Sequence, residues 1–128
     1  MEMELDKIML IEASKVPDLV VRSCGKPDLQ RLVKVFNEVF SKTPDPFPHI
    51  TEKDLEDLPT DRILVAEIRG EIAGFLMCGI KRIEDEEVGV VGYVGVLEKY
   101  RRRGIATHLA MKAGEYFLKN RLKKIICE

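Results

Sequence analysis

Helix-type and strand-type hydrophobic spacing alternate along this chain. Apolar residues recur every three or four positions in Pro27–Ser41, which predicts an amphipathic helix. The same spacing from Ile105 to about Asn120 predicts a second one. Short apolar runs rich in β-branched residues predict strands at Leu19–Cys24, Ile63–Ile68, Ile72–Ile80, Val88–Val96 and Lys124–Cys127. The hydrophobic pattern therefore predicts strand, helix, three strands, helix and strand in that order.

Polar segments between these runs define the connections. Arg69-Gly70-Glu71 indicates a hairpin, and Glu84-Asp85-Glu86 marks a second polar turn. Thr43–Ile50 contains three prolines, which exclude regular structure. Thr51 to about Leu58 is predicted to be a short helix, because its first and fourth residues have the spacing of a capping box. Met3–Ala13 mixes apolar and acidic residues and leaves open whether it forms a strand or a helix.

Composition narrows the class of protein. A chain of 128 residues with 45% hydrophobic and 34% charged residues is typical of one globular domain. No apolar run approaches the roughly 18 residues of a membrane span, and the first ten residues lack the pattern of a signal peptide. The net charge of −1 gives no general preference for nucleic acid. Cys24, Cys78 and Cys127 have no metal-ligand spacing, and their odd number favours a reducing, cytoplasmic location over a disulfide framework.

The junction between the strand Val88–Val96 and the following helix carries the clearest chemical signal. An apolar strand runs into a basic turn that contains a glycine, and the turn opens directly onto the helix. Such a junction directs backbone N–H groups and the positive end of a helix dipole at one place, which favours a bound phosphate. Arg101, Gly104 and Ala106 fit the pattern Arg/Gln-x-x-Gly-x-Gly/Ala, and Tyr100 directly precedes it.

This junction resembles the cofactor-binding turn of the GNAT superfamily of N-acetyltransferases, which bind the pyrophosphate of acetyl-CoA there. The order of predicted elements from about Leu19 onward and the hairpin Val65–Phe75 are also similar to that family. The resemblance implies an α/β (α+β) fold with a mixed, mostly antiparallel sheet flanked by helices and splayed between the family's fourth and fifth strands. It also implies that residues 1–128 form one GNAT domain that ends at the fifth strand.

The resemblance further implies acetyl-CoA as the cosubstrate and assigns residues to it. Val94, Gly95 and Val96 are expected to face the pantetheine arm and the acetyl group. The residues expected at the pyrophosphate are Arg101, Arg102, Arg103, Gly104, Ile105, Ala106 and Thr107. A side chain at Gly104 would hold the phosphates away from the turn, whereas backbone N–H groups do the binding.

Catalytic residues are less well defined by the resemblance. Family members continue past the fifth strand with a helix whose Tyr commonly protonates the leaving thiolate, but this sequence stops at Glu128. A truncated chain, a partner that completes the sheet and a degenerate enzyme are the alternatives, with truncation preferred. If the chain is complete, a bare last strand predicts dimerisation or strand exchange. Glu128 is the candidate general base, because N-terminal acetyltransferases of ribosomal proteins carry a Glu on this strand. Glu86, Glu87 and Tyr93 are weaker catalytic candidates, and His49 in the proline-rich loop is a candidate for contact with the acceptor.

The function predicted from the resemblance is acetyl transfer from acetyl-CoA to a primary amine by direct attack on the thioester. The acceptor amine is left open between a protein N-terminus, a lysine and a small amine. Acidic residues of the predicted short helix, among them Glu52 and Asp54, would suit a cationic amine. The alternatives are a non-catalytic acyl-CoA-binding or assembly subunit and, with less support, a nucleic-acid-binding module that uses Lys99–Arg103 and Lys119–Lys124.

Overall fold

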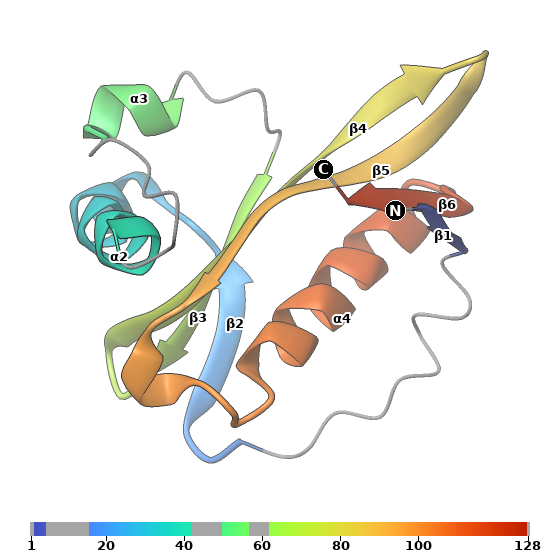
Figure 1. The fold of residues 1–128 in the computed structure, drawn as a ribbon. Coiled ribbons are helices and arrows are strands. Elements are labelled where there is room, and N and C mark those ends of the chain that lie inside the picture. Colours follow the sequence, from blue (N-terminus) through green and yellow to red (C-terminus); the bar gives the residue numbers. More distant parts are fainter. Residues whose placement is uncertain (1, 5–15, 42–49, 57–61, 128) are drawn as a thin grey trace.

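A six-stranded sheet organises the fold (Figure 1). The computed structural model describes residues 2–4, 16–41, 50–56 and 62–127. The strands are β1 (Glu2–Glu4), β2 (Leu19–Ser23), β3 (Arg62–Ile68), β4 (Glu71–Ile83), β5 (Glu86–Val96) and β6 (Lys124–Cys127). Their order across the sheet is β1-β6-β5-β4-β3-β2, and neighbours are antiparallel except for the parallel pair β5 and β6. The prediction of a mixed, mostly antiparallel sheet is confirmed.

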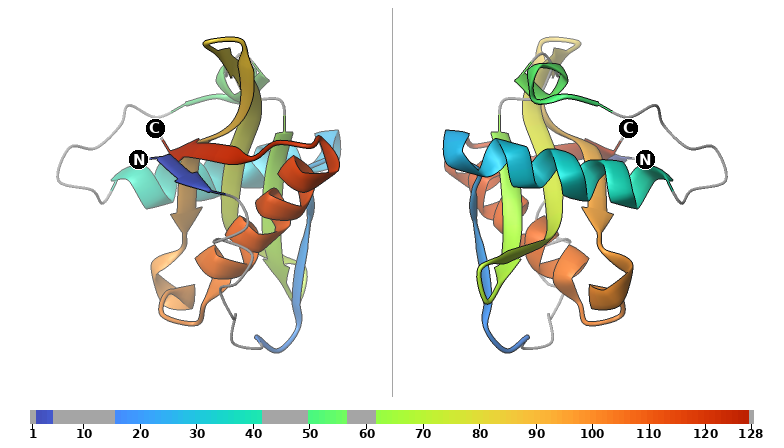
Figure 2. Two further views of the ribbon diagram at one scale, coloured as in Figure 1. Left: turned by 90° about the vertical axis from the view of Figure 1, so that its right-hand side faces the viewer. Right: turned by 90° about the vertical axis from the view of Figure 1, so that its left-hand side faces the viewer.

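Helices cover both faces of this sheet. Helices α2 (Leu29–Ser41) and α3 (Glu52–Glu56) lie on one face, and α4 (Ile105–Lys119) lies on the other (Figures 1 and 2). Two 3-10 turns, η1 (Lys26–Asp28) and η2 (Glu98–Tyr100), precede α2 and the turn before α4. The first predicted helix therefore begins as a 3-10 turn. The predicted capping box is present at α3, where the Thr51 N–H donates to Asp54 at 2.8 Å and the Asp54 N–H donates to the Thr51 hydroxyl at 3.3 Å.

The two faces bury separate apolar clusters. Leu109 and Phe117 of α4 are fully buried against one face, and Leu32 of α2 is fully buried against the other. Strand β4 is buried on both faces over residues 72–79 because it lies between β3 and β5 under both layers of helices. The strand and the helix that flank the junction between β5 and α4 both contact this buried strand.

The hairpin between β4 and β5 is longer than its hydrophobic pattern predicts. Ladder pairing continues through Arg82 opposite Glu87 and Ile83 opposite Glu86, although residues 81–87 are exposed. Both turn residues, Glu84 and Asp85, have positive φ, as a two-residue type I′ turn requires. The charged side chains in this part of both strands interrupt the hydrophobic pattern, so the sequence predicts shorter strands. The backbone hydrogen bonds continue because they depend on the turn and the register.

The outer edge of β6 corrects one expectation from the sequence. The prediction of a bare last strand is wrong, because β1 pairs with β6 from Glu2 opposite Ile126 to Glu4 opposite Lys124. Met3–Ala13 thus begins within a strand, and its remainder from residue 5 lies outside the described residues. Dimerisation stays a prediction. Unpaired backbone groups on β6 no longer support it at the three positions that pair with β1.

Strand β5 and helix α4 approach closely at Gly89. A Cβ on Gly89 would lie 2.9 Å from ring atoms of Phe117, closer than such atoms pack. We expect Gly89→Ala to lower the free energy of unfolding by about 1–2 kcal/mol, because the fully buried ring has no free space into which to move. Urea unfolding checks this value. The double variant Gly89→Ala/Phe117→Leu should lose less than the sum of the two single variants, and strict additivity would contradict the close contact.

Candidate functional site: the open edge of β5 and the turn before α4

The sheet opens along the second half of β5. Strand β6 pairs with β5 from Gly89 to Val91, and no described residue of β6 pairs with residues 92–96. A bulge lies at the same place, because β5 advances three residues between the pairs Cys78–Val91 and Leu76–Val94 while β4 advances two. Bulges bend a strand and increase its twist. The family's fourth and fifth strands correspond to β5 and β6 here, so the bulge lies beside the place where the predicted splay begins.

Backbone polar groups of β5 face this opening. The Leu97 N–H donates to the Ala73 carbonyl at 2.8 Å, toward β4. Because backbone groups alternate in direction along a strand, those of Val96 and Val94 point away from β4. The Val96 carbonyl accordingly accepts a hydrogen bond from Arg101 Nε at 3.0 Å, and the Val94 side chain is exposed. The edge therefore offers backbone donors and acceptors beside an apolar side chain.

The turn that follows β5 leaves its amides free. Within the described part of the chain, no acceptor is found for the N–H groups of residues 102–107, whereas the His108 N–H donates to the Gly104 carbonyl and begins α4. Arg102 and Gly104 have φ of 66° and 85°, while Arg103 between them is not left-handed. Such alternation turns successive N–H groups toward a common concavity that binds anions.

Gly104 leaves this concavity open. A Cβ on Gly104 would meet no described atom within 4 Å, and its φ of 85° disfavours any other residue. The positive end of the α4 dipole and the exposed side chains of Arg101, Arg102 and Arg103 add positive potential here. The donor set therefore fits a phosphate or diphosphate group.

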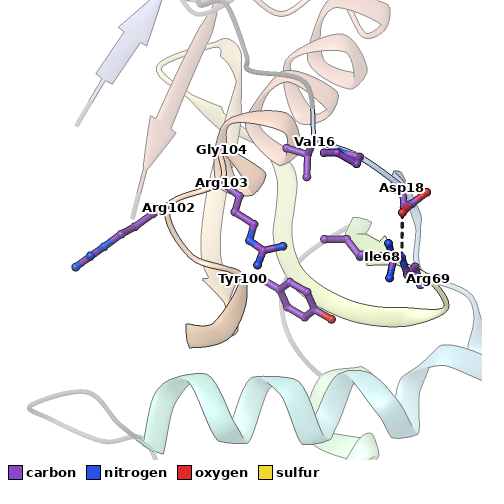
Figure 3. A pocket seen from close by; sticks show the side chains of 9 residues that line it. Val16, Asp18, Ile68, Arg69, Tyr100, Arg102, Arg103 and Gly104 are labelled. Atoms are coloured by element: carbon purple, nitrogen blue, oxygen red, sulfur yellow. Dashed lines mark hydrogen bonds and ion pairs between the residues drawn. The ribbon is translucent and has the colours of Figure 1, made fainter.

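A cavity of about 670 Å³ lies beside the turn (Figure 3). Tyr100 and Arg103 point toward it, and the Arg102 side chain is directed away from it. The segment just before β2 and the β3–β4 turn form its other walls, where Arg69 Nε is 3.0 Å from Asp18 Oδ2. None of residues 92–96 lines this cavity. The cavity is therefore separate from the open edge of β5. The two features adjoin different parts of the turn.

A carboxylate on the β3–β4 hairpin contacts η2, the 3-10 turn that precedes the amide-lined turn. Glu71 accepts a hydrogen bond from the Tyr100 hydroxyl at 2.6 Å and lies 2.7 Å from Lys99 Nζ. The Lys99 and Tyr100 donors hold the pKa of Glu71 below its ordinary value, and the same hydrogen bond raises the pKa of Tyr100. Sequence reasoning missed Glu71, because no local pattern pairs residues on a hairpin with residues of a distant turn.

The structure brings together the residues predicted to bind the cofactor. Val94, Gly95 and Val96 form the open edge, and the run from Arg101 to Thr107 forms the adjoining turn and first helical residues. The catalytic candidate Glu128 and the acceptor-contact candidate His49 lie outside the described residues. Glu86 and Glu87 are exposed at the far end of the β4–β5 hairpin. Tyr93 is half-buried, with its ring centroid 5.7 Å from that of Phe36.

A sheet opened beside an amide-lined turn at the start of a helix defines a class of protein that binds phosphate-bearing cofactors. Residues 30–128 match the family model described as Acetyltransferase (GNAT) family. The chain belongs to this family. Across the described residues, no helix is long and apolar enough to cross a membrane.

Individual relatives agree with this assignment. An uncharacterized N-acetyltransferase of Archaeoglobus fulgidus is 30% identical over 113 residues, which cover 80% of this chain and 76% of that protein. The aminoglycoside acetyltransferase meta-AAC0020 from an uncultured soil metagenomic sample, solved with sisomicin, has a TM-score of 0.70 at 16% identity over 87% of this chain and 77% of that one. The ribosomal-protein-alanine N-acetyltransferase of Brucella melitensis biovar Abortus 2308 has a TM-score of 0.70 at 17% identity, over 86% and 79%. The aminoglycoside N-acetyltransferase AAC(6')-Iy, solved with CoA, has a TM-score of 0.69 at 16% identity, over 89% and 80%. At these identities the solved structures show the shared fold.

Proposed function

We propose that this chain transfers the acetyl group of acetyl-CoA to a primary amine by direct attack of the amine on the thioester. The observation that carries the proposal is the row of N–H groups at residues 102–107, which have no acceptor among the described residues and lie beside the open edge of β5. A diphosphate needs several convergent donors, and an extended pantetheine arm needs a free strand edge. The family assignment and the CoA bound to AAC(6')-Iy support the same ligand.

The proposal gives separate tasks to the two parts of the site. The amides of residues 102–107 hold the diphosphate, and Gly104 keeps the approach open. The outward backbone groups of Val94 bond the pantetheine arm, and the Val96 N–H stabilises the oxyanion as the amine attacks. The side chains of Arg102 and Arg103 increase the local concentration of the anionic cosubstrate through their field.

Proton transfer requires a base on the acceptor side, because a primary amine is mostly protonated at neutral pH. Glu128 remains the proposed general base, on its sequence position alone. The acceptor is proposed to be a protein N-terminus, a lysine or a small amine, and the exposed acidic side chains of Glu52 and Asp54 on α3 favour a cationic one. The printed names of two structural neighbours state a small-molecule acceptor, an aminoglycoside, and a protein acceptor, the alanine of a ribosomal protein.

Calorimetric titration with CoA, followed by an amine screen, tests the proposal. We expect saturable binding of CoA, and release of free thiol from acetyl-CoA in the presence of at least one class of primary amine. Mass spectrometry of the product should show one added acetyl group on nitrogen. Binding without turnover on peptide, lysine and small-amine panels would favour the non-catalytic acyl-CoA-binding subunit. Salt-sensitive retention on heparin without any response to CoA would favour the nucleic-acid-binding alternative.

A further inference from the structure

Glu71 connects the β3–β4 hairpin to the segment that enters the phosphate turn. One carboxylate oxygen accepts the Tyr100 hydroxyl at 2.6 Å, and the other lies 2.7 Å from Lys99 Nζ. Glu71 is the first residue of β4, directly after a turn whose Gly70 carbonyl accepts a hydrogen bond from Arg31 of α2 at 2.6 Å. The carboxylate is therefore presented by a part of the molecule that is itself fixed to α2.

Tyr100 transmits this restraint to the turn. Its half-buried ring packs against both apolar clusters, and the Arg103 guanidinium lies 5.6 Å from the ring centroid. Only Arg101 separates Tyr100 from Arg102, where the backbone enters the left-handed region. The amides of residues 102–107 have no acceptor within the described structure, so their direction depends on how the preceding residues are held.

We propose that Glu71 is a positioning residue for the phosphate-binding turn, fixing Tyr100 and Lys99 so that the amides of residues 102–107 converge before the ligand arrives. This inference rests on the proposed function. The lowered pKa of Glu71 and the raised pKa of Tyr100 support it, because the carboxylate stays charged and the phenol stays a donor at neutral pH. The pair of Glu71 and Lys99 is about half exposed and contributes little to folding stability. We therefore expect the loss of this pair to change CoA binding and to leave folding stability nearly unchanged.

The sign of a substitution separates positioning from a simple charge effect. Removal of an acidic group near a site for an anion should tighten CoA binding if only the local field matters. Positioning predicts the opposite result. If the competent arrangement falls to about a tenth of the population, the dissociation constant rises roughly tenfold.

Calorimetry with CoA on Glu71→Ala, Glu71→Gln and Tyr100→Phe tests the inference. We expect the dissociation constant to rise roughly tenfold for Glu71→Ala and less for Glu71→Gln, whose amide oxygen still accepts the Tyr100 hydroxyl. The dissociation constant of Glu71→Ala/Tyr100→Phe should be close to that of Glu71→Ala, because both changes remove the same hydrogen bond between Tyr100 and Glu71. In steady-state assays the KM for acetyl-CoA should rise while kcat at saturation is retained.

Asp18→Asn is the matched control. Asp18 is an exposed acid that borders the cavity beside the turn, as Tyr100 does, and it pairs with Arg69 instead of with the turn. Its removal should leave the dissociation constant for CoA unchanged or slightly lower. Equal or tighter CoA binding by Glu71→Ala, with binding by the unmodified protein intact, overturns the positioning role alone. Absence of CoA binding by the unmodified protein overturns the proposed function, and the inference with it.

Discussion

Gly104→Glu should abolish the rise in melting temperature that CoA gives the unmodified protein. At a CoA concentration about a hundredfold above its dissociation constant, binding adds roughly 2.7 kcal/mol to the free energy of unfolding, which corresponds to several degrees. The new carboxylate would occupy the open space over Gly104 and place a negative charge against the phosphates. Thermal denaturation with and without CoA measures the effect.

Gly70→Glu controls for backbone strain in this experiment. Gly70 has a φ of 81°, close to the 85° of Gly104, and a Cβ there would also meet no described atom within 4 Å. Both variants should therefore lose about 1–2 kcal/mol of stability without ligand. Only Gly104→Glu should lose the response to CoA. A preserved CoA response in Gly104→Glu would exclude this turn as the diphosphate site.

Asp28→Asn should lower the free energy of unfolding by about 2–3 kcal/mol. Asp28 is 6% exposed and accepts hydrogen bonds from Arg22, from Arg31 and from the Gly25 N–H at 2.7–2.9 Å. The amide would lose the charge and direct an NH2 group at a guanidinium. The two arginines remain partly solvated, which keeps the cost below that of a fully buried unpaired charge. Urea unfolding at pH 7 measures this difference.

The same carboxylate predicts the pH dependence of that difference. The Arg22 hydrogen bond, followed by the Gly25 N–H, holds the pKa of Asp28 well below its ordinary range. A lowered folded-state pKa gives stability that is present above the unfolded-state pKa of about 3.9 and is lost as the pH falls further. The gap between the unmodified protein and Asp28→Asn should be constant from about pH 8 to 5 and shrink below about pH 4.

Asp18→Asn provides the comparison for Asp28. Its ion pair with Arg69 is 3.0 Å long but has partners that are 52% and 82% exposed, so its loss should cost less than about 1 kcal/mol. Asn also tolerates the positive φ of 61° at this position. Equal losses for the two variants would show that burial of Asp28 adds nothing to its ion pairs.

Local sequence determined the elements and the cofactor turn. The spacing of apolar residues in α2 and α4 records which face of each helix is buried, and this is a property of neighbouring residues. Arg101, Gly104 and Ala106 predicted an amide-lined turn, because their spacing places a residue without a side chain, Gly104, directly before the start of a helix. The capping box at Thr51 was equally local, and its hydrogen bonds are present.

Contacts between distant segments were decided by tertiary structure alone. The pairing of β1 with β6 joins residues near opposite ends of the sequence, and nothing in either segment specifies its partner. The hydrogen bond between Glu71 and Tyr100 and the burial of Asp28 depend on how the hairpin and α2 pack beside the turn. A charged residue has the same local pattern whether it is solvated or bonded across the fold, so the sequence predicts the turn, and the fold determines what holds it in place.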